Sequence, residues 1–450
     1  MQHTPYTVYY IPLSIDFPPL KWYTYPMINA NEKRLINYPP NLKRFDMNRK
    51  PRRQPLWTLL LIRIVSGLLL LKKKYKIVKN DMKGVKPPFL MLCNHNQFMD
   101  FEVAAMAVWP RRQNNIASIE AFNIQPRLIR HLGTIAKRKF TRGISTVKNI
   151  MHALKKNRSI VSLYPEARYG AAGAAADLPA ALGKMIKMGG CPVVTLIFHG
   201  HHLERPSWTY MKSRKVKTTA VMTYLLSAED VQKMSAAEIQ AAVEKAFYYN
   251  DYEYQLENNI QITEPYRAEG LHRMLYKCPK CGAEFKMASA GAELSCGACG
   301  KAWTLKPDGR LEGNDGATEF ETIPEWYEWE RAEVAKEIRE GTYSFTQEMT
   351  LKSMPNPKKF IGLGRAVFTH GMNGFRATGH YNGEDFTIIK RPLENYAVHV
   401  EYNFPYLKKR DVISFSTDDD TFFFLPDNSD SLQKVALATE ELYKFCYGKN

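Results

Sequence analysis

A histidine and an aspartate five residues apart form the first pattern in this sequence with a clear chemical use. The segment LMLCNHNQFMD begins at Leu90, and its apolar run ends at the polar pair Asn94 and His95. Such a run predicts a buried β-strand, and a helix is expected to begin near Phe98. In the first turn of that helix, Asp100 could accept a hydrogen bond from Nδ1 of His95 and leave Nε2 free to accept a proton. The pair could then act as a general base on a hydroxyl group.

The same spacing also has a purely structural interpretation. The chain contains 11 histidines, so a histidine five residues before an aspartate can arise by chance. His95 could simply end the strand while Asp100 caps the helix. The pattern by itself leaves both interpretations open.

Strand-like apolar runs alternate with helical stretches in the region that contains this pair. The runs FLMLC, SIVSLY and CPVVTLIF are separated by stretches such as STVKNIMHALKKN, which has a helical period. This alternation predicts an α/β domain over residues 76–265. His95 would then project from the carboxyl edge of the sheet, where α/β domains bind their substrates.

Four blocks in this region resemble, in the same order, the motifs of the glycerolipid acyltransferases, a family that includes 1-acylglycerol-3-phosphate acyltransferase. NHNQFMD is similar to the NHxxxxD motif, and GTIAKRKF, LYPEARYG and CPVVTLIF are similar to the second, third and fourth blocks. The resemblance implies a mixed sheet flanked by helices, with His95 as the general base and Asp100 as its partner. It also implies that a lipid hydroxyl attacks an acyl thioester, supplied by acyl-CoA or acyl carrier protein.

The resemblance further implies which residues bind the acceptor, a lysophospholipid such as 1-acylglycerol-3-phosphate. Three consecutive cations in the second block could neutralise its phosphate. The glutamate of the third block would orient the polar head of the acceptor. An arginine in this block stands one position before the arginine of the family's motif. The substrate-binding candidates are Asn94, Lys137, Arg138, Lys139, Glu166 and Arg168.

Several positions depart from the family's motifs. Ala167 replaces the glycine of the third block, and Tyr169 stands in place of its arginine. Ala136 and Lys139 differ from the usual residues of the second block, and Thr195 stands where the fourth block often has a second proline. These positions lie mostly in the acceptor-binding blocks, so they bear on the identity of the acceptor more than on the reaction.

The front of the chain is strongly basic and contains one long apolar run. The net charge of the whole chain is +18, and residues 1–80 hold fifteen Lys or Arg against three acidic residues. The run LWTLLLIRIVSGLLLL, from Leu56 to Leu71, has basic residues on both sides. It is shorter than the roughly 20 residues that cross a bilayer. We therefore predict a helix that lies on or re-enters an anionic membrane surface, with a buried core helix as the alternative.

No secretion signal is recognisable in this sequence, and four of its seven cysteines form CxxC pairs. Both observations favour a reducing compartment. We expect the protein at the cytoplasmic face of the membrane, as a peripheral or monotopic protein.

The paired cysteines predict a metal site. CPKC and CGAC present four thiols on two turns, namely Cys278, Cys281, Cys296 and Cys299. Four thiolates favour a structural Zn²⁺ in a closed tetrahedral site, and this segment resembles a zinc ribbon.

Three histidines in FHGHHL, namely His199, His201 and His202, could also be taken for metal ligands. We expect instead that they follow a strand at the edge of the active site.

Short strands separated by Gly, Asn and Asp turns dominate the last part of the chain. They predict a small antiparallel β barrel followed by a C-terminal helix. The predicted segments are a basic, aromatic N-terminal arm (1–55), a membrane-interfacial helix (56–75), the acyltransferase α/β domain (76–265), the zinc ribbon (276–305), a connecting helix (318–341) and the β-rich domain with its C-terminal helix (342–450).

Two other functions remain open on the sequence alone. A zinc ribbon with a basic N-terminal region is also compatible with a nucleic-acid-binding protein, although the apolar run would have no role there. A non-catalytic lipid-binding module could share the acyltransferase fold. Because His95, Asp100 and Glu166 are all present, we expect an active O-acyltransferase and no nucleic acid as its partner.

Overall fold

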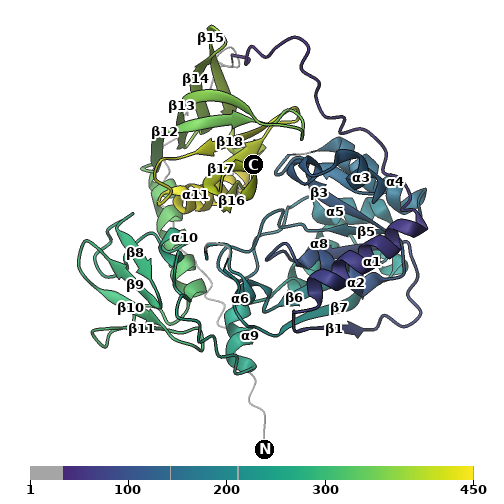
Figure 1. Cartoon of the computed structure of the whole chain (residues 1–450), viewed down its shortest axis with the longest axis horizontal. Helices are drawn as coiled ribbons and strands as arrows, with labels where there is room; N and C mark the ends of the chain where they lie inside the picture. The colour runs from purple at the N-terminus through teal and green to yellow at the C-terminus, as the bar shows by residue number, and fades with distance from the viewer. Residues whose placement is uncertain (1–33, 142, 210–211, 449–450) are drawn as a thin grey trace, which may run out of the picture.

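Three separate sheets build the computed structural model, which describes residues 34–141, 143–209 and 212–448. Figure 1 shows them in three lobes: the α/β sheet on the right, a small sheet at the lower left and the C-terminal sheet at the upper left. Residues 1–33, most of the predicted N-terminal arm, lie outside the described residues.

The first sheet has seven strands in the order β1-β7-β6-β2-β5-β3-β4. The five neighbouring strands β6, β2, β5, β3 and β4 run parallel. Strand β7 pairs antiparallel with β6 and parallel with β1. The sheet is therefore mixed, as predicted. Its strands are β1 (Tyr75–Asn80), β2 (Leu90–Cys93), β3 (Gln113–Ser118), β4 (Ile135–Lys137), β5 (Ile160–Leu163), β6 (Val193–His199) and β7 (Thr218–Leu226).

Helices cover both faces of this sheet. Successive residues of a strand point to opposite faces, and the apolar residues of β2 point to both. Leu90 and Leu92 of β2 pack in one cluster with residues of α4, α5 and α8. Met91 and Cys93 pack in another cluster with α1 and α2. The helices of this region are α1 (Leu56–Leu70), α2 (Asp100–Val108), η2 (Ile119–Asn123), α3 (Pro126–His131), α4 (Ile144–Lys155), α5 (Leu182–Gly189), α6 (His201–Glu204), α7 (Ala228–Lys233), α8 (Ala236–Ala246) and α9 (Asp251–Glu257).

The helix α1 packs on α2 with one side and leaves an apolar side uncovered. Leu59 and Leu70 are buried, as are Thr58 and Ser66. The exposed apolar side chains include a set that is 51–74% exposed, namely Trp57, Leu60, Ile64, Leu68 and Leu71. Their spacing of three and four residues places them on one stripe, which does not match a buried core helix.

None of the helices in the described part of the chain is long and apolar enough to cross a membrane.

The second sheet has four antiparallel strands in the order β11-β10-β9-β8. These strands are β8 (Met287–Ala290), β9 (Glu293–Cys296), β10 (Ala302–Leu305) and β11 (Leu311–Gly313). The long helix α10 (Ile323–Glu340) follows it, beginning at a capping box between Thr322 and Glu325 and ending at Gly341 in the left-handed conformation. Trp326 of this helix packs against Trp303 at a ring distance of 4.8 Å, which attaches the small sheet to α10.

The third sheet is antiparallel and is followed by the C-terminal helix, as predicted. Its strands lie in the open order β15-β14-β13-β12-β18-β17-β16, so β15 and β16 are not paired as they would be in a closed barrel. The connection between them passes through η4, which contacts α11. The elements are β12 (Ser344–Ser353), β13 (Ile361–Gly371), β14 (Gly374–Tyr381), β15 (Glu384–Lys390), η4 (Pro392–Glu394), β16 (His399–Phe404), η5 (Pro405–Leu407), β17 (Arg410–Ser416), β18 (Thr421–Leu425) and α11 (Leu432–Tyr447), and η3 (Leu271–Arg273) lies earlier in the chain.

The segment before α1 connects the lobes. Arg34 forms an isolated bridge with Thr387 of β15. Figure 1 shows this dark purple segment running from the tip of the C-terminal sheet past α3 and α4 to the start of α1. The chain therefore passes along the C-terminal sheet before it enters the α/β domain.

Candidate active site

Asp100 lies at the start of α2 and is completely buried. Its Oδ2 accepts hydrogen bonds from Nδ1 of His95 at 2.9 Å and from the backbone N–H groups of Asn96 and Gln97 at 2.6 and 3.0 Å. Its Oδ1 accepts one from Nδ1 of His201 at 2.6 Å. Burial alone would raise the pKa of this carboxyl, but the bonds from His201 and His95 outweigh it and lower the pKa to about 2. The carboxylate therefore stays ionised at neutral pH, and both histidines hold their proton on Nδ1.

The imidazole of His95 lies between two tyrosines. The rings of Tyr164 and Tyr169 both have their centroids 4.5 Å from that of His95. The side chain of His95 is nevertheless 23% exposed, and no described residue forms a hydrogen bond with its Nε2. Because Nδ1 carries the proton, Nε2 presents a lone pair. This is the geometry that a general base requires.

Glu166 supports the backbone of His95. Its Oε2 accepts from the N–H of His95 at 2.9 Å, and its Oε1 accepts from the N–H of Ala176 and the hydroxyl of Tyr249, both at 3.1 Å. The N–H of Gly170 donates to the carbonyl of His95 at 2.7 Å. Burial raises the pKa of Glu166 to about 7. Both oxygens of Glu166 are thus engaged within the protein, in a position that holds the loop of His95.

Asn94 is also part of the framework. Its Nδ2 donates to the carbonyl of Phe198 at 3.0 Å, and the N–H of Phe198 donates to its Oδ1 at 2.7 Å. The residue is fully buried. It joins the carboxyl ends of β2 and β6, so the structure places this substrate-binding candidate in the scaffold of the site.

Arg138 is not open to a phosphate, in contrast to the prediction. It is 2% exposed, and its two terminal nitrogens donate at 2.8–3.0 Å to four oxygens of the C-terminal sheet. Those oxygens belong to Met354, Pro355, Asp419 and Thr421. The guanidinium joins two domains because its acceptors arrive from more than 200 residues away in the sequence.

Arg168 is likewise bound within the protein, in contrast to the prediction. It forms a buried ion pair with Glu440 of α11, and the other oxygen of Glu440 accepts from Arg331 of α10 at 2.7 Å. Burial would raise the pKa of Glu440, but the two guanidiniums lower it to about 2. The charge of Arg168 is thus already neutralised by an acid of the last helix.

The two lysines of the second block remain closer to the expected role. Nζ of Lys137 donates to the carbonyl of Thr141 at 3.2 Å, and burial lowers its pKa to about 8. Lys139 forms no ion pair among the described residues, but its charge acts on Glu401, which pairs with His399 at 2.8 Å on β16. His95 is also near enough to Glu401 for the two side chains to interact electrostatically. The C-terminal sheet therefore borders the site.

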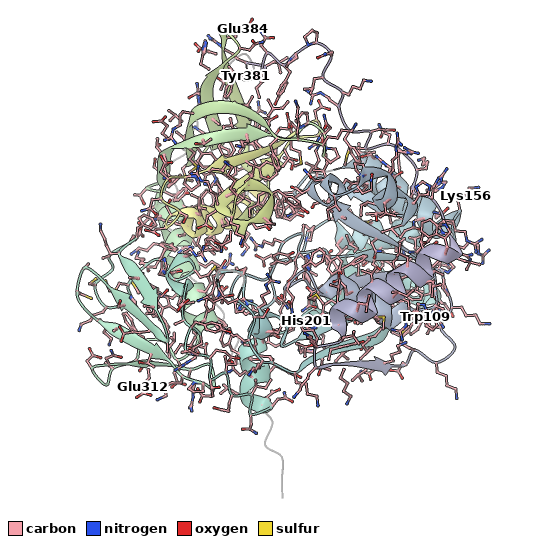
Figure 2. All side chains as sticks on the ribbon, viewed as in Figure 1. Trp109, Lys156, His201, Glu312, Tyr381 and Glu384 are labelled. Atoms are coloured by element: carbon pink, nitrogen blue, oxygen red, sulfur yellow. The ribbon has the colours of Figure 1, made fainter. Side chains whose placement is uncertain are left out.

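His201 is a second imidazole on Asp100, a role that the sequence did not predict. It is 2% exposed, and its Nε2 is buried without a hydrogen-bond partner in the described residues. Figure 2 places His201 at the inner side of the α/β lobe. The sequence feature that could have indicated this role is the group of histidines at the end of β6. The carboxyl end of β6 lies beside that of β2. His202 donates to the carbonyl of Gly170 at 3.1 Å, and burial lowers its pKa to about 3.

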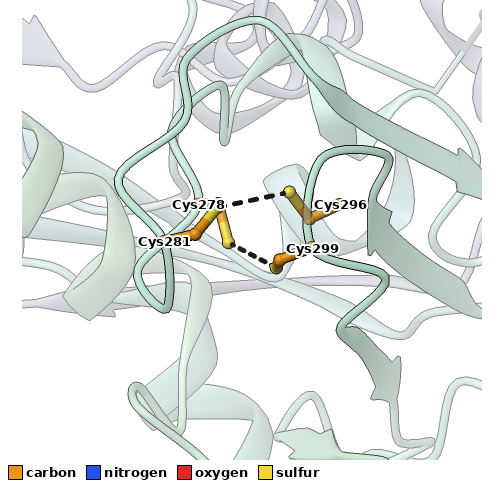
Figure 3. A group of neighbouring side chains, drawn as sticks. All are labelled: Cys278, Cys281, Cys296 and Cys299. Atoms are coloured by element: carbon orange, nitrogen blue, oxygen red, sulfur yellow. Dashed lines mark hydrogen bonds between the residues drawn. The ribbon is translucent and has the colours of Figure 1, made fainter.

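The four cysteines of the CxxC pairs converge in space (Figure 3). All four Sγ atoms lie within 4.8 Å of one another, with Cys278 and Cys299 at 3.8 Å and Cys281 and Cys296 at 3.8 Å. Tetrahedral zinc with Zn–S bonds of about 2.3 Å places its sulfurs about 3.8 Å apart. The arrangement therefore fits a four-thiolate zinc site.

A glycine with the same conformation forms each of the two cysteine turns. Each CxxC is followed by a glycine with positive φ, Gly282 at 71° and Gly300 at 75°. The N–H of each glycine donates to the carbonyl of the first cysteine of its pair at 2.9 Å. A side chain would be strained in this conformation, so the glycines after each pair allow the turns that bring the thiols together.

A family model matches the α/β part of the chain. Residues 73–199 match the family model described as Acyltransferase, which confirms the resemblance and shows that the chain carries an acyltransferase domain. No curated protein matches the chain. A similar solved structure is the 1-acyl-sn-glycerophosphate (LPA) acyltransferase, PlsC, from Thermotoga maritima, with 16% identity and a TM-score of 0.33 over 42% of this chain and 77% of that chain.

We predict that Asp100→Asn lowers the free energy of unfolding by roughly 2 kcal/mol at pH 7, because a neutral amide cannot match four donors. The folded-state pKa of Asp100 is depressed to about 2, so its stabilising contribution is complete above its ordinary pKa and is lost as the pH falls towards 2. Urea unfolding at pH 7, 4 and 3 should therefore show that the difference in unfolding free energy between wild type and variant becomes smaller as the pH falls.

The exposed Asp81 provides the control, since Asp81→Asn should change the unfolding free energy by less than about 0.5 kcal/mol at every pH. A gap for Asp100→Asn that stays constant between pH 7 and 3 would contradict the depressed pKa.

Proposed function

We propose that this protein is a membrane-associated acyltransferase that moves a fatty acyl chain from an acyl thioester to a hydroxyl of a lysophospholipid. The proposal takes 1-acylglycerol-3-phosphate as the acceptor and acyl-CoA or acyl carrier protein as the donor. The observation that carries it is the His95–Asp100 pair at 2.9 Å inside an acyltransferase domain, with Nε2 of His95 unbonded.

In this mechanism Nε2 of His95 removes the proton of the acceptor hydroxyl while its oxygen attacks the thioester carbonyl. The buried carboxylate of Asp100 stabilises the imidazolium that forms and keeps the ring in place. The tetrahedral intermediate then expels the thiolate, which takes the proton from the imidazolium and leaves as a thiol. The ester is formed and His95 returns to its starting state.

The acceptor's phosphate needs cations that the protein has not already neutralised. Arg138 and Arg168 are bonded to the C-terminal sheet and α11, so we assign the phosphate to Lys137 and Lys139.

The apolar stripe of α1 supports attachment to a membrane surface. Exposed cations stand at both ends of the helix, namely Arg52, Arg53, Lys72 and Lys74. Phe98, three residues beyond His95, is 59% exposed, and α1 packs on the helix that begins at Asp100. We infer that the anchor and the opening of the active site face the same surface, at the cytoplasmic side.

The four cysteines support a structural zinc. Zinc would be held by four thiolates with no open position for water, so it would serve folding and take no part in transfer. The cluster lies in the same core as α10, whose Arg331 pairs with Glu440.

Replacing His95 with alanine should lower the turnover of acyl transfer by about a thousandfold or more, because the hydroxyl loses its base. The fold should persist, since Asp100 keeps its bonds from His201 and two backbone N–H groups. Release of thiol from acyl-CoA in the presence of lysophosphatidic acid measures this. The exposed His380 provides the control, and His380→Ala should transfer like the wild type. A His95→Ala enzyme with more than about a tenth of the wild-type turnover would contradict this assignment.

Serine at Leu60, Ile64 and Leu68 should lower partitioning onto anionic vesicles by roughly a hundredfold, because each replacement removes exposed apolar area that would enter the membrane. The control carries serine at Leu35, Leu256 and Val367, which are exposed and lie outside α1. Vesicle sedimentation gives the measurement. Equal partitioning of the two variants would show that α1 is not the anchor.

Metal analysis should find one zinc per chain, and Cys281→Ser should lose it and lower the melting temperature by roughly 5 °C or more. Cys446→Ser should retain zinc, since Cys446 lies outside the cluster. A purified wild-type protein without zinc, or a melting temperature unchanged by chelation, would disprove the zinc site.

A further inference from the structure

A second candidate site is a basic cavity of about 780 Å³, a volume within the range of small-ligand sites. Its walls come from the segment before α1, from α3 and from the β12–β13 connection, with Lys50, Arg127 and Lys358 as examples. Tyr381, which Figure 2 labels at the tip of the C-terminal sheet, also lines it. Ligand binding here would bring two domains and the connecting segment together.

The cavity lies at the opposite edge of the sheet from His95. Thr134, just before β4, lines the cavity, whereas Lys137 ends that strand on the side of the active site. The rise of a strand separates these two positions by about 10 Å. His95 follows β2, and β2 runs parallel to β4 within the sheet, so His95 lies at the carboxyl edge. The cavity and His95 therefore lie toward opposite ends of the strands of this sheet.

Charge in this cavity is almost entirely of one sign. Among the described residues that line it, nine are Lys or Arg and one, Asp46, is acidic. Within the described residues, none of these nine cations forms an ion pair with a carboxylate. This contrasts with Arg168 and Arg331, which share the buried acid Glu440. Like charges held together repel, and an anion would relieve that repulsion.

Several of the cations are held in place by the protein. Arg130 donates to the carbonyl of Asp46 at 2.6 Å, and its guanidinium lies 4.3 Å from the ring centroid of Phe45. Burial and the neighbouring charge of Arg49 lower the pKa of Arg130. Arg52 donates to Nε2 of His131 at 3.1 Å, and Nδ1 of His131 donates to a backbone carbonyl at 2.8 Å. The charges are thus arranged before any ligand arrives.

We propose that this cavity binds a ligand that carries several phosphate groups. A single phosphate would leave most of the nine cations without a counter-ion, whereas guanidinium and ammonium groups in this number suit a polyphosphorylated molecule. Two sources supply that chemistry: the nucleotide part of coenzyme A, or the phosphorylated head of an anionic phospholipid.

The test uses the full chain and two soluble probes, coenzyme A and inositol trisphosphate, in isothermal titrations at low and moderate salt. Glutamine at Lys50, Lys358 and Lys359 removes three exposed charges of the cavity and should weaken binding by roughly tenfold or more. The matched control carries glutamine at Lys217, Lys245 and Lys336, which are also exposed and lie outside the cavity. Melting curves check that both variants fold.

Binding of coenzyme A that the cavity variant weakens and the control keeps identifies a nucleotide phosphate site. The same result with inositol trisphosphate identifies a lipid headgroup site. Failure of both probes to bind, equal affinities for the two variants, or binding of an oligonucleotide alone overturns the proposal. Because the readout is binding and requires no transfer, this result is independent of whether His95 is the base.

Discussion

One buried negative charge organises the α/β domain of this protein. The carboxylate of Asp100 has no contact with solvent and must be matched by donors that the chain brings to it. Two come from the loop before α2, one from His95, and one from His201 at the start of α6. This requirement explains why the carboxyl ends of β2 and β6 are joined so tightly through Asn94 and Phe198.

The same charge sets the chemistry of the histidine. The Nδ1–H of His95 donates a hydrogen bond to Asp100, and Glu166 and Gly170 hold its backbone. The ring of His95 therefore has little freedom to turn away. The two tyrosines beside it narrow the approach to Nε2, and one of them, Tyr169, stands where related motifs have an arginine. An aromatic wall in place of a cation makes the immediate surroundings of the base more apolar, which suits a reaction between lipid-tailed molecules.

The parts of the fold and site that the sequence could predict are those whose partners lie nearby in the chain. His95 and Asp100 share one loop, each cysteine pair closes within one turn, and the stripe of α1 repeats every three or four residues. His201 was missed because it reaches Asp100 across 101 residues. Arg138 and Arg168 have the right type and position to hold a phosphate, but their acceptors belong to a sheet and a helix made much later. A sequence motif identifies the type of a residue. It does not show which acceptor from a distant part of the chain will bind that residue in the folded protein.

The pairing of Arg168 with Glu440 spans 272 residues, and it has a consequence for how the protein matures on the ribosome. A nascent chain with only the α/β region outside the exit tunnel has the His95 loop, yet the arginine of its third block still lacks a counter-ion. Only when α11 emerges can that charge be buried and the C-terminal sheet close against Arg138. The folding of the α/β region is thereby coupled to that of the C-terminal sheet and α11 through the bonds of Arg138 and Arg168.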